Sequence, residues 1–311
     1  MLIRILGSAA GGGFPQWNCN GRMSSRVRRG EAGLRARTQS SLAVTANGRD
    51  WVLLNASPDL RQQINETEAL WPAADGPLRA SPIKAVVVTN ADVDHIIGLI
   101  NLREGQPFAL YAAPRVMATI NANSVFNVLA ADKVPRRNLP TDAAFALTGA
   151  NDEALGITVK AFNVPGKVAL FLEDASGSEN YGSKDGDTIG LEITDEASGK
   201  AFFYIPGCAE VDATLARRIA GASLLFFDGT LFTDDEMIAQ GLSTKTGQRM
   251  GHISVSGPAG SITALGELGI GRKIYVHINN SNPMLDENSA ERRSVTAAGW
   301  EVGHDGMEIS L

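Results

Sequence analysis

The amino-acid sequence predicts an α/β protein that folds as a four-layer αββα sandwich. Three observations support this prediction. Both halves of the chain contain several short apolar runs typical of buried strands, and helical patterns lie between these runs. Acidic or imidazole residues also directly follow several of the runs. Because strand ends gather at one edge of such a fold, we expect the active residues there.

Apolar runs and turn signals predict the elements of the first half. The predicted strands lie at residues 2–6, 41–44, 51–55, 83–88 and 110–112. A glycine-rich loop at 7–13 permits close backbone approach, and Asn47-Gly48 favours a hairpin turn. Ser57-Pro58-Asp59 predicts a helix start, with serine at the cap, proline in the first turn and aspartate near the positive end. Further helices are predicted at 96–102 and 114–130.

The second half repeats this pattern. Its predicted strands lie at residues 157–162, 168–172, 189–194, 201–205, 223–227 and 273–276, with a short closing strand within 302–311. The stretch 173–187 is rich in Gly, Ser and Asp, so we expect a mobile surface loop there. No fixed-period repeat is present, and we expect residues 1–311 to form a single domain.

Length and composition limit the possible classes of protein. The chain has 311 residues, of which 44% are hydrophobic, which is ample for a core. The net charge of −6 argues against nucleic-acid binding, although six arginines gather at 22–37, either in a solvated loop or as a contact for an anionic partner. No apolar run approaches the roughly 18 residues of a membrane span. Without a signal-peptide pattern, and with only Cys19 and Cys208 as cysteines, we expect a cytoplasmic protein.

Metal-binding residue types cluster at four of the predicted strand or loop ends. These segments are Asp92-Val93-Asp94-His95, Asp228-Gly229-Thr230, Gly251-His252-Ile253-Ser254 and Val276-His277-Ile278-Asn279-Asn280. A single histidine is most often structural, but these segments hold three of the four histidines in the chain. Together with the nearby carboxylates, they predict a shared metal site.

The first of these segments resembles the metal-binding signature of the metallo-β-lactamase superfamily. That signature, His-x-His-x-Asp-His-x-x-Gly, aligns with residues 90–98, but Asn90 and Asp92 replace its first two histidines. Cys208 stands where a bridging aspartate is usual, and 163–167 lacks the further histidine. The resemblance implies a metallo-β-lactamase-like sandwich in which one ion keeps a full set of ligands. Those ligands are Asp94, His95 and His277.

This ligand set limits the chemistry of the ion. Two imidazoles and one carboxylate with open positions are typical of non-heme iron(II) oxygenases. Zinc accepts the same ligands. We therefore expect one Fe(II), with zinc able to take its place in vitro. The alternative for Asp94 is a helix N-cap, which is compatible with ligation.

Longer motifs are similar to the coenzyme PQQ synthesis protein B family. They run from the first strand to the C-terminus: Leu6-Gly-Ser-Ala-Ala-Gly-Gly-Gly-Phe-Pro-Gln-Trp-Asn-Cys-Asn20, Ala36-Arg-Thr-Gln-Ser-Ser41, Asn55-Ala-Ser-Pro-Asp59, Gly98-Leu-Ile-Asn-Leu-Arg-Glu-Gly105, Asp228-Gly-Thr230, Met250-Gly-His252, His277-Ile-Asn-Asn-Ser-Asn-Pro283, Leu285-Asp-Glu-Asn-Ser289 and Asp305-Gly-Met307. Motifs of this length and order are highly specific.

The family makes pyrroloquinoline quinone (PQQ) from a glutamate and a tyrosine cross-linked in a precursor peptide. The resemblance implies an iron- and O2-dependent hydroxylase that acts on the tyrosine ring of the excised Glu–Tyr diamino acid. It implies a cytoplasmic protein that acts beside other PQQ biosynthesis enzymes, with a homodimer left open. The alternatives are a carrier that assists transport of PQQ or its precursor, and a metal-dependent hydrolase. The altered first-metal ligands weigh against the hydrolase.

The chain departs from this family at a cysteine cluster. Most relatives have Cys-x-Cys-x-x-Cys after the Trp-Asn pair, whereas only Cys19 remains here, with Gly21 and Ser24 at the other positions. One thiolate cannot build a tetrahedral zinc site, so we predict no structural zinc. We expect a looser or arginine-anchored loop over 20–35, and a buried Cys19 that behaves as a small apolar residue.

Three further residues are candidates for proton transfer. His252 and Asp228 match a pair that serves as proton donor in hydrolytic relatives, and the carboxylate would orient the imidazole. The alternative is a histidine that ties two loops together. Asp92 is a further ligand, a histidine partner or a general base, and its alternative is an exposed loop acid.

Substrate binding is predicted from the family and from residue type. Ser57 and Asp59 stand where the family approaches its substrate, with helix capping as the alternative. Asn279 and Asn280 are candidates to bind the polar ends of an amino acid, or else to shape a turn. The candidates to hold carboxylates bidentately are Arg37, Arg61 and Arg103.

Overall fold

The computed structural model describes residues 1–173 and 183–311, and its strands form two seven-stranded sheets. The first contains β1 (Leu2–Gly7), β2 (Ser41–Thr45), β3 (Trp51–Leu54), β4 (Ile83–Val88), β5 (Ala109–Ala112), β6 (Arg136–Asn138) and β14 (Glu308–Ser310). The second contains β7 (Ala144–Thr148), β8 (Ala154–Asn163), β9 (Ile189–Asp195), β10 (Ala201–Ile205), β11 (Leu224–Asp228), β12 (Arg272–Val276) and β13 (Trp300–Val302). Their orders are β14-β1-β2-β3-β4-β5-β6 and β13-β12-β11-β10-β9-β8-β7.

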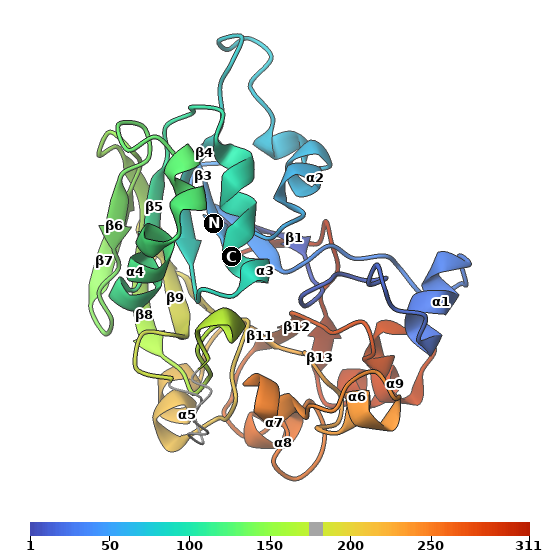
Figure 1. Ribbon diagram of the computed structural model, residues 1–311. Helices are drawn as coiled ribbons and strands as arrows, with labels where there is room; N and C mark the ends of the chain where they lie inside the picture. The colour runs from blue at the N-terminus through green and yellow to red at the C-terminus, as the bar shows by residue number, and fades with distance from the viewer. Residues whose placement is uncertain (174–182) are drawn as a thin grey trace.

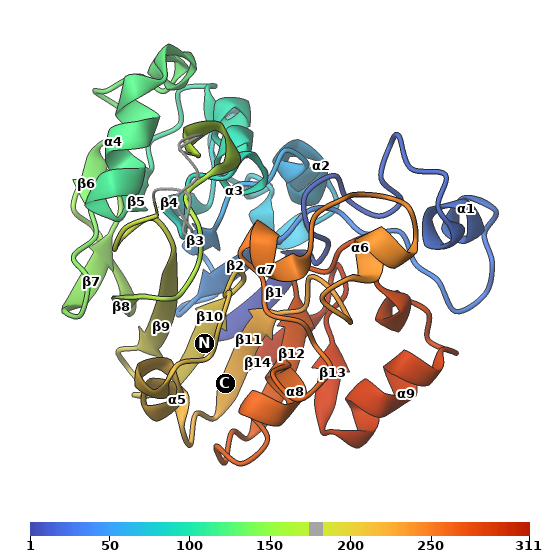
Figure 2. The ribbon, with the colours of Figure 1, turned by 60° about the horizontal axis from the view of Figure 1, so that its bottom comes forward.

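Short helices cover the outer faces of both sheets. The α-helices are α1 (Arg22–Arg28), α2 (Leu60–Asn65), α3 (Val93–Ile96), α4 (Pro114–Ala122), α5 (Ala213–Ile219), α6 (Glu236–Ala239), α7 (Gly247–Met250), α8 (Ser261–Ala264) and α9 (Ala290–Ala297). The 3-10 helices are η1 (Glu68–Leu70), η2 (Ile97–Leu102), η3 (Ser124–Val128), η4 (Leu170–Leu172) and η5 (Pro283–Leu285). Helices α2 to α4 lie on the side of the first sheet and α5 to α9 on the side of the second (Figures 1 and 2). The predicted four layers are therefore confirmed.

Three apolar clusters hold these layers together. The central cluster joins the facing sides of the two sheets and includes Ile5, Val52, Val87, Ile157, Leu191 and Phe226. The outer face of the first sheet packs on its helices through Trp51, Val86, Leu60, Ile96 and Val116. The outer face of the second packs through Phe203, Phe227, Leu215 and Val295. Because each fully buried side chain of this kind contributes about 1.5–3 kcal/mol, the three clusters fix the strand ends in place.

Parallel pairing brings the ends of several strands to one edge. In the first sheet β3, β4 and β5 run parallel, and in the second β10 to β13 do. The chain beyond β1 also pairs with the chain beyond β12, through a bridge between Ala9 and Ile278. The glycine-rich loop that follows Ala9 therefore lies beside the segment that carries His277.

Several predicted elements differ in the structure. Residues 168–172 form no strand, because Leu170, Phe171 and Leu172 lie half-exposed in η4 rather than in a sheet. The helix predicted at 96–102 is 3-10 helix η2, which directly follows the single turn of α3 that ends at Ile96. The helix predicted at 114–130 ends at Ala122, since Asn123 is extended, and η3 follows. Of the loop predicted at 173–187, residues 174–182 lie outside the described residues.

The arginine-rich segment is anchored by several of its arginines, although four of the six remain exposed to solvent. It contains α1, whose Arg26 Nη1 lies 2.7 Å from Asp286 Oδ2, while Arg28 donates to the carbonyl of Cys19. Arg37 is buried and donates to Ser8 Oγ. The expectation of a buried Cys19 is wrong: the residue is half-exposed, and its Sγ accepts the Gly21 amide at 3.3 Å because the chain turns tightly there.

A search of residues 1–173 and 183–311 finds no helix with the length and apolar character needed to cross a membrane.

Candidate metal centre

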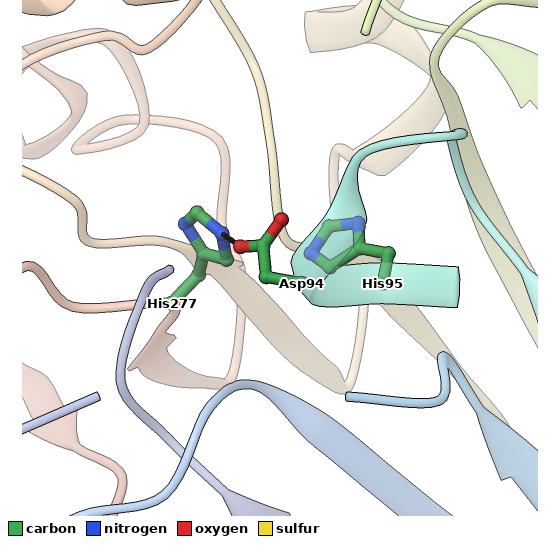
Figure 3. Close-up of side chains that lie close together, drawn as sticks. All are labelled: Asp94, His95 and His277. Carbon is green, nitrogen blue, oxygen red and sulfur yellow. Dashed lines mark hydrogen bonds and ion pairs between the residues drawn. The ribbon is translucent and has the colours of Figure 1, made fainter. Parts of the chain in front are cut away.

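Three predicted metal ligands meet at the edge where the two sheets come together (Figure 3). Asp94 and His95 lie on α3, directly after β4, whereas His277 follows β12 of the other sheet. The potential ligand atoms of the three side chains lie within 4.8 Å of one another. The rings of His95 and His277 have centroids 5.2 Å apart and are inclined by 74°. One ion can therefore be bound by residues that follow strands of both sheets.

Asn90 determines which nitrogen of His95 carries the proton. The Asn90 Oδ1 atom accepts the backbone N–H of Asp92 at 3.0 Å, which identifies it as the amide oxygen. It lies 2.8 Å from His95 Nδ1, so that nitrogen must donate. The Nε2 atom then keeps its lone pair, and it is buried without a hydrogen-bond partner among the described residues. A buried imidazole lone pair beside a carboxylate and a second imidazole fits a divalent metal ion.

Thr230 plays the corresponding part for His277. Its hydroxyl donates to Asp228 Oδ1 at 2.7 Å and lies 2.9 Å from His277 Nδ1, from which it accepts. The Nε2 atom of His277 therefore faces Asp94, whose Oδ2 is 3.1 Å away. His277 also has a left-handed backbone with φ of 55°, which costs about 1 kcal/mol or more for a non-glycine residue. The Ile278 N–H fixes this bend by donating to the Ser8 carbonyl at 2.9 Å.

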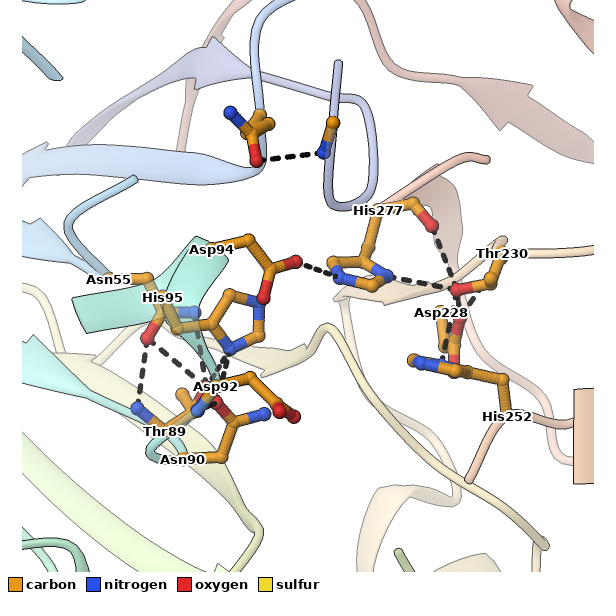
Figure 4. A network of polar contacts seen from close by, with 12 residues as sticks. Asn55, Thr89, Asn90, Asp92, Asp94, His95, Asp228, Thr230, His252 and His277 are labelled. Carbon is orange, nitrogen blue, oxygen red and sulfur yellow. Dashed lines mark hydrogen bonds and ion pairs between the residues drawn. The ribbon is translucent and has the colours of Figure 1, made fainter. Parts of the chain in front are cut away.

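A second cluster of Asp228, His252 and His277 lies beside the first (Figure 4). His252 Nδ1 is 2.6 Å from Asp228 Oδ2, and its ring stacks on that of His277 at a centroid distance of 5.1 Å. Asp228 is fully buried and also accepts the backbone N–H groups of Cys208 and Thr230, each at 2.9 Å. The carboxylate thus orients the His252 ring, as the sequence predicted it would.

The close packing of these groups shifts their pKa values. Burial lowers the pKa of His95 to about 4. Burial opposes the charge on Asp94, but the imidazoles of His95 and His277 outweigh it and hold the pKa of that carboxyl below its usual range. The pKa of Asp228 is lowered in the same way, mainly by His252. The pKa of His277 is raised because the Asp94 carboxylate outweighs burial.

Asp92 is neither an exposed loop acid nor part of either cluster. It lines the cavity, and its Oδ1 accepts the Leu170 N–H at 3.2 Å. Burial and the nearby Asp94 raise its pKa. Asp92 also occupies the N-cap position of α3, the place suggested as an alternative for Asp94, but its side chain makes no capping hydrogen bond.

A cavity of about 310 Å³ opens over both clusters. Besides the acids and imidazoles, its lining includes Gln16, Lys167, Leu170, Met237, Lys245 and Met250. Asn279 lines it as well, and Asn280 supports it by donating from Nδ2 to Gln16 Oε1 at 2.7 Å. The volume lies at the lower end of the range for small-molecule sites.

The structure does not bring the other proposed substrate residues to this cavity. Ser57 donates to Gln63, and Asp59 accepts from the Gln39 amide, so both are engaged elsewhere. The arginines proposed to hold carboxylates are likewise absent from the lining: Arg37, Arg61 and Arg103. Ser57 does not cap α2 either, since the helix begins at Leu60 with Asp59 at its N-cap.

Sequence reasoning missed several residues that the cavity contains. Thr230 was only part of a family motif, and its central position depends on the packing of three separate segments. Lys245, Met237 and Met250 have no recognisable spacing in the sequence that would point to a site. Only the folded chain reveals them.

Comparison with known proteins agrees with this fold. A model of the beta-lactamase superfamily domain matches residues 50–278, which defines the class of protein. Within that class, the chain belongs to the coenzyme PQQ synthesis protein B family. It is 51% identical over 311 residues to the protein of that name from Methylorubrum extorquens, and 49% identical to that from Xanthomonas oryzae pv. oryzae, covering 100% of each.

Solved structures support the same assignment. The crystal structure of zinc-bound PqqB from Methylobacterium extorquens is 51% identical, covers 100% of both chains and superposes with a TM-score of 0.93. A diphosphatase of the PhnP family is similar at 18% identity and a TM-score of 0.68, and the human short-form tRNase Z at 16% and 0.60. The last two likenesses show the fold alone.

Proposed function

We propose that this chain acts in PQQ biosynthesis, where it catalyses iron- and O2-dependent hydroxylation of the tyrosine ring of the Glu–Tyr-derived precursor. Its relatives in Methylorubrum and Xanthomonas carry the PQQ synthesis name over their full length, and one relative was solved with zinc bound. The observation that carries the proposal is the cluster of Asp94, His95 and His277, in which His95 Nε2 has no hydrogen-bond partner within the described part of the chain.

The chain's own residues would hold the ion and keep its ligands in the correct protonation state. Asp94, His95 and His277 supply the donor atoms, while Asn90 and Thr230 fix the two imidazole tautomers. When bound, Fe(II) in such a set supplies redox chemistry toward O2 that no side chain provides. Hydroxylation places one oxygen atom of O2 on the ring and releases the other as water, which consumes two protons and two electrons. An external reductant supplies the electrons.

His252 is the residue we assign to proton transfer with the substrate. Its Nδ1 is bound to Asp228, so its Nε2 remains available, and the side chain lines the cavity. Asp228 holds the ring in place through a 2.6 Å contact. Asp92, two residues before Asp94 in the chain, also lines the cavity, and we assign it as a second proton acceptor.

The altered ligand positions favour one ion over the two that hydrolytic relatives use. The Asn90 oxygen is taken by His95 and by the Asp92 amide, and Asn163 accepts the Gly186 N–H instead of facing the site. The Cys208 thiol is buried, which raises its pKa, and it donates to the Glu210 carbonyl. A two-metal centre, in which both ions share an activated water, would therefore lack ligands at these positions.

The test is turnover of the Glu–Tyr diamino acid by protein loaded anaerobically with Fe(II) or with zinc. We expect O2 consumption, and a product heavier by one oxygen atom, only with Fe(II), O2 and a reductant. Product formation by the zinc form without O2 would instead support a hydrolase. Tight binding of PQQ without any O2 consumption would support a carrier.

A further inference from the structure

The cavity combines two kinds of lining that come from different parts of the chain. Asp92 and Asp94 lie at the start of α3, on the side of the first sheet, and bring negative charge beside the imidazoles. Met237 on α6 and Met250 on α7 come from the side of the second sheet and are apolar. In the view of Figure 2, α7 lies between the elements of the first sheet and those of the second, with α3 above it.

Two lysines line the cavity, and only one has its charge balanced. Lys167 Nζ lies 2.9 Å from Glu173 Oε1, and Glu173 also binds Arg249. Lys245 lies between α6 and α7 and is half-buried, and its backbone N–H donates to Ser243 Oγ at 3.1 Å. Its ammonium has no carboxylate within 4.0 Å in the described part of the chain.

We infer that Lys245 is the carboxylate-binding residue of this cavity and orients the substrate within it. A half-buried ammonium without a counter-ion is stabilised by an incoming anion. Asp92 and Asp94 in the lining repel a ligand carboxylate, and Lys167 is already paired with Glu173, so Lys245 is where the cavity accepts it. The cavity thus selects a ligand with an anionic end and an aromatic or apolar body.

The apolar lining defines the rest of that ligand. Met237 and Met250 both line the cavity. Thioether sulfur makes favourable contacts with aromatic rings. With a carboxylate on Lys245, an aromatic body lies along the methionines and its ring is directed toward Asp94, His95 and His277. That the ring is a phenol rests on the proposed function; the carboxylate-binding role of Lys245 does not.

The test compares the binding of PQQ itself, which carries carboxylates, with that of its methyl ester, in which these groups are neutral. The variants are Lys245→Met, Lys245→Arg and, as a matched control on the surface away from the cavity, Lys133→Met. We expect Lys245→Met to weaken PQQ binding about 10- to 100-fold, and Lys245→Arg by only a few-fold. Lys133→Met should bind as the wild type does.

The ester separates charge from shape. We expect Lys245→Met and wild type to bind the ester equally, with equal metal content and melting temperature. Equal PQQ binding by Lys245→Met and wild type would overturn the inference, as would equal weakening of acid and ester or a wild type that binds no PQQ. Turnover of the Glu–Tyr diamino acid is measured on the same preparations. Absent turnover with intact Lys245-dependent binding would overturn the proposed function alone.

Discussion

The two clusters that share His277 differ in how their polar atoms are satisfied. In the first, His95 Nε2 is buried without a partner among residues 1–173 and 183–311, and the potential ligand atoms lie within 4.8 Å of one another. In the second, the Thr230 hydroxyl lies within 3.1 Å of Asp228 Oδ1, His252 Nδ1 and His277 Nδ1, and takes the central position itself. Both groups are rich in the same residue types, so composition alone does not separate them.

The difference shows that a candidate metal site can be recognised by buried donor atoms that lack a hydrogen-bond partner. A buried nitrogen without a hydrogen bond is costly unless an ion occupies the site, whereas a fully bonded network has no such need. We therefore propose the first cluster as the metal centre, and assign the second to holding His277 and the imidazole of His252 in place. Substitutions at three positions test this distinction, and a fourth tests the segment beside the cavity.

The largest effect is expected for His277→Ala, because this residue belongs to both clusters. We expect loss of metal binding and of turnover together, measured by metal analysis after dialysis and by O2 consumption. His304→Ala is the control, since His304 belongs to neither cluster and should leave both unchanged. Undiminished turnover in His277→Ala would remove the one-ion scheme.

The next effect separates the clusters from each other. His252→Gln removes the imidazole of the second cluster while it leaves Asp94, His95 and His277 in place. We expect turnover to fall about 10²- to 10⁴-fold, as is usual for loss of a general acid or base, with unchanged iron content. Loss of iron in this variant would mean that the second cluster, and not the first, binds the metal.

A smaller effect is expected at Thr230, which acts on the metal ligands through His277. Thr230→Val keeps the shape but cannot accept the Nδ1 proton, so the imidazole loses its preferred tautomer. Metal affinity, measured by competition with a chromophoric chelator, should fall about 10- to 100-fold. Thr230→Ser retains the hydroxyl and should restore affinity to within a few-fold of wild type. Equal affinities for all three proteins would contradict the role assigned to Thr230.

The smallest effect concerns the segment that covers Asp92. Glu173 binds Arg249 and Lys167, which lower its pKa to about 2. Because the folded-state pKa is depressed, its contribution to stability is present above the usual value of 4.5 and is lost as the pH falls toward about 2. Glu173→Gln should lower the free energy of unfolding by up to about 1 kcal/mol at pH 7, and by less below pH 4.5.

Urea unfolding at pH 7, 5 and 4 measures this difference. Glu104→Gln is the control, because Glu104 is exposed and its nearest cation, Arg103, is 3.7 Å away. A constant difference between wild type and Glu173→Gln across these values would show that the ion pairs do not set it.

The sequence predicts most of the strands because apolar runs leave a local signal, although it does not predict β6 or β7. The three residues of the first cluster were expected from the resemblance to the metallo-β-lactamase signature, and the structure brings them together. Apolar runs such as that of β4 are long enough to identify a buried strand, and a scarce histidine directly after one stands out. The same logic failed for Leu170 to Leu172, where an apolar run lies half-exposed beside the cavity and not in a sheet. Hydrophobicity indicates burial, but a surface around a cavity is also apolar.

The rest of the site depends on contacts between distant segments. Helices α6 and α7 have only four residues each, too few for a periodic pattern, and they carry or flank Met237, Lys245 and Met250. The prediction of substrate-binding residues near 57–61 is wrong for the converse reason. The motif matches the family well, but Asp59 accepts from Gln39 and Ser57 donates to Gln63. Spacing along the chain does not reveal which surface a side chain faces.

The three donor atoms of the metal centre are divided between the two sheets, about 180 residues apart in the sequence. Neither half of the chain holds a complete set, so a nascent or partly folded protein cannot retain an ion by this route. Under the proposed function, reactivity toward oxygen would arise only after both halves have packed against each other, which would protect an unfinished polypeptide from oxidative damage.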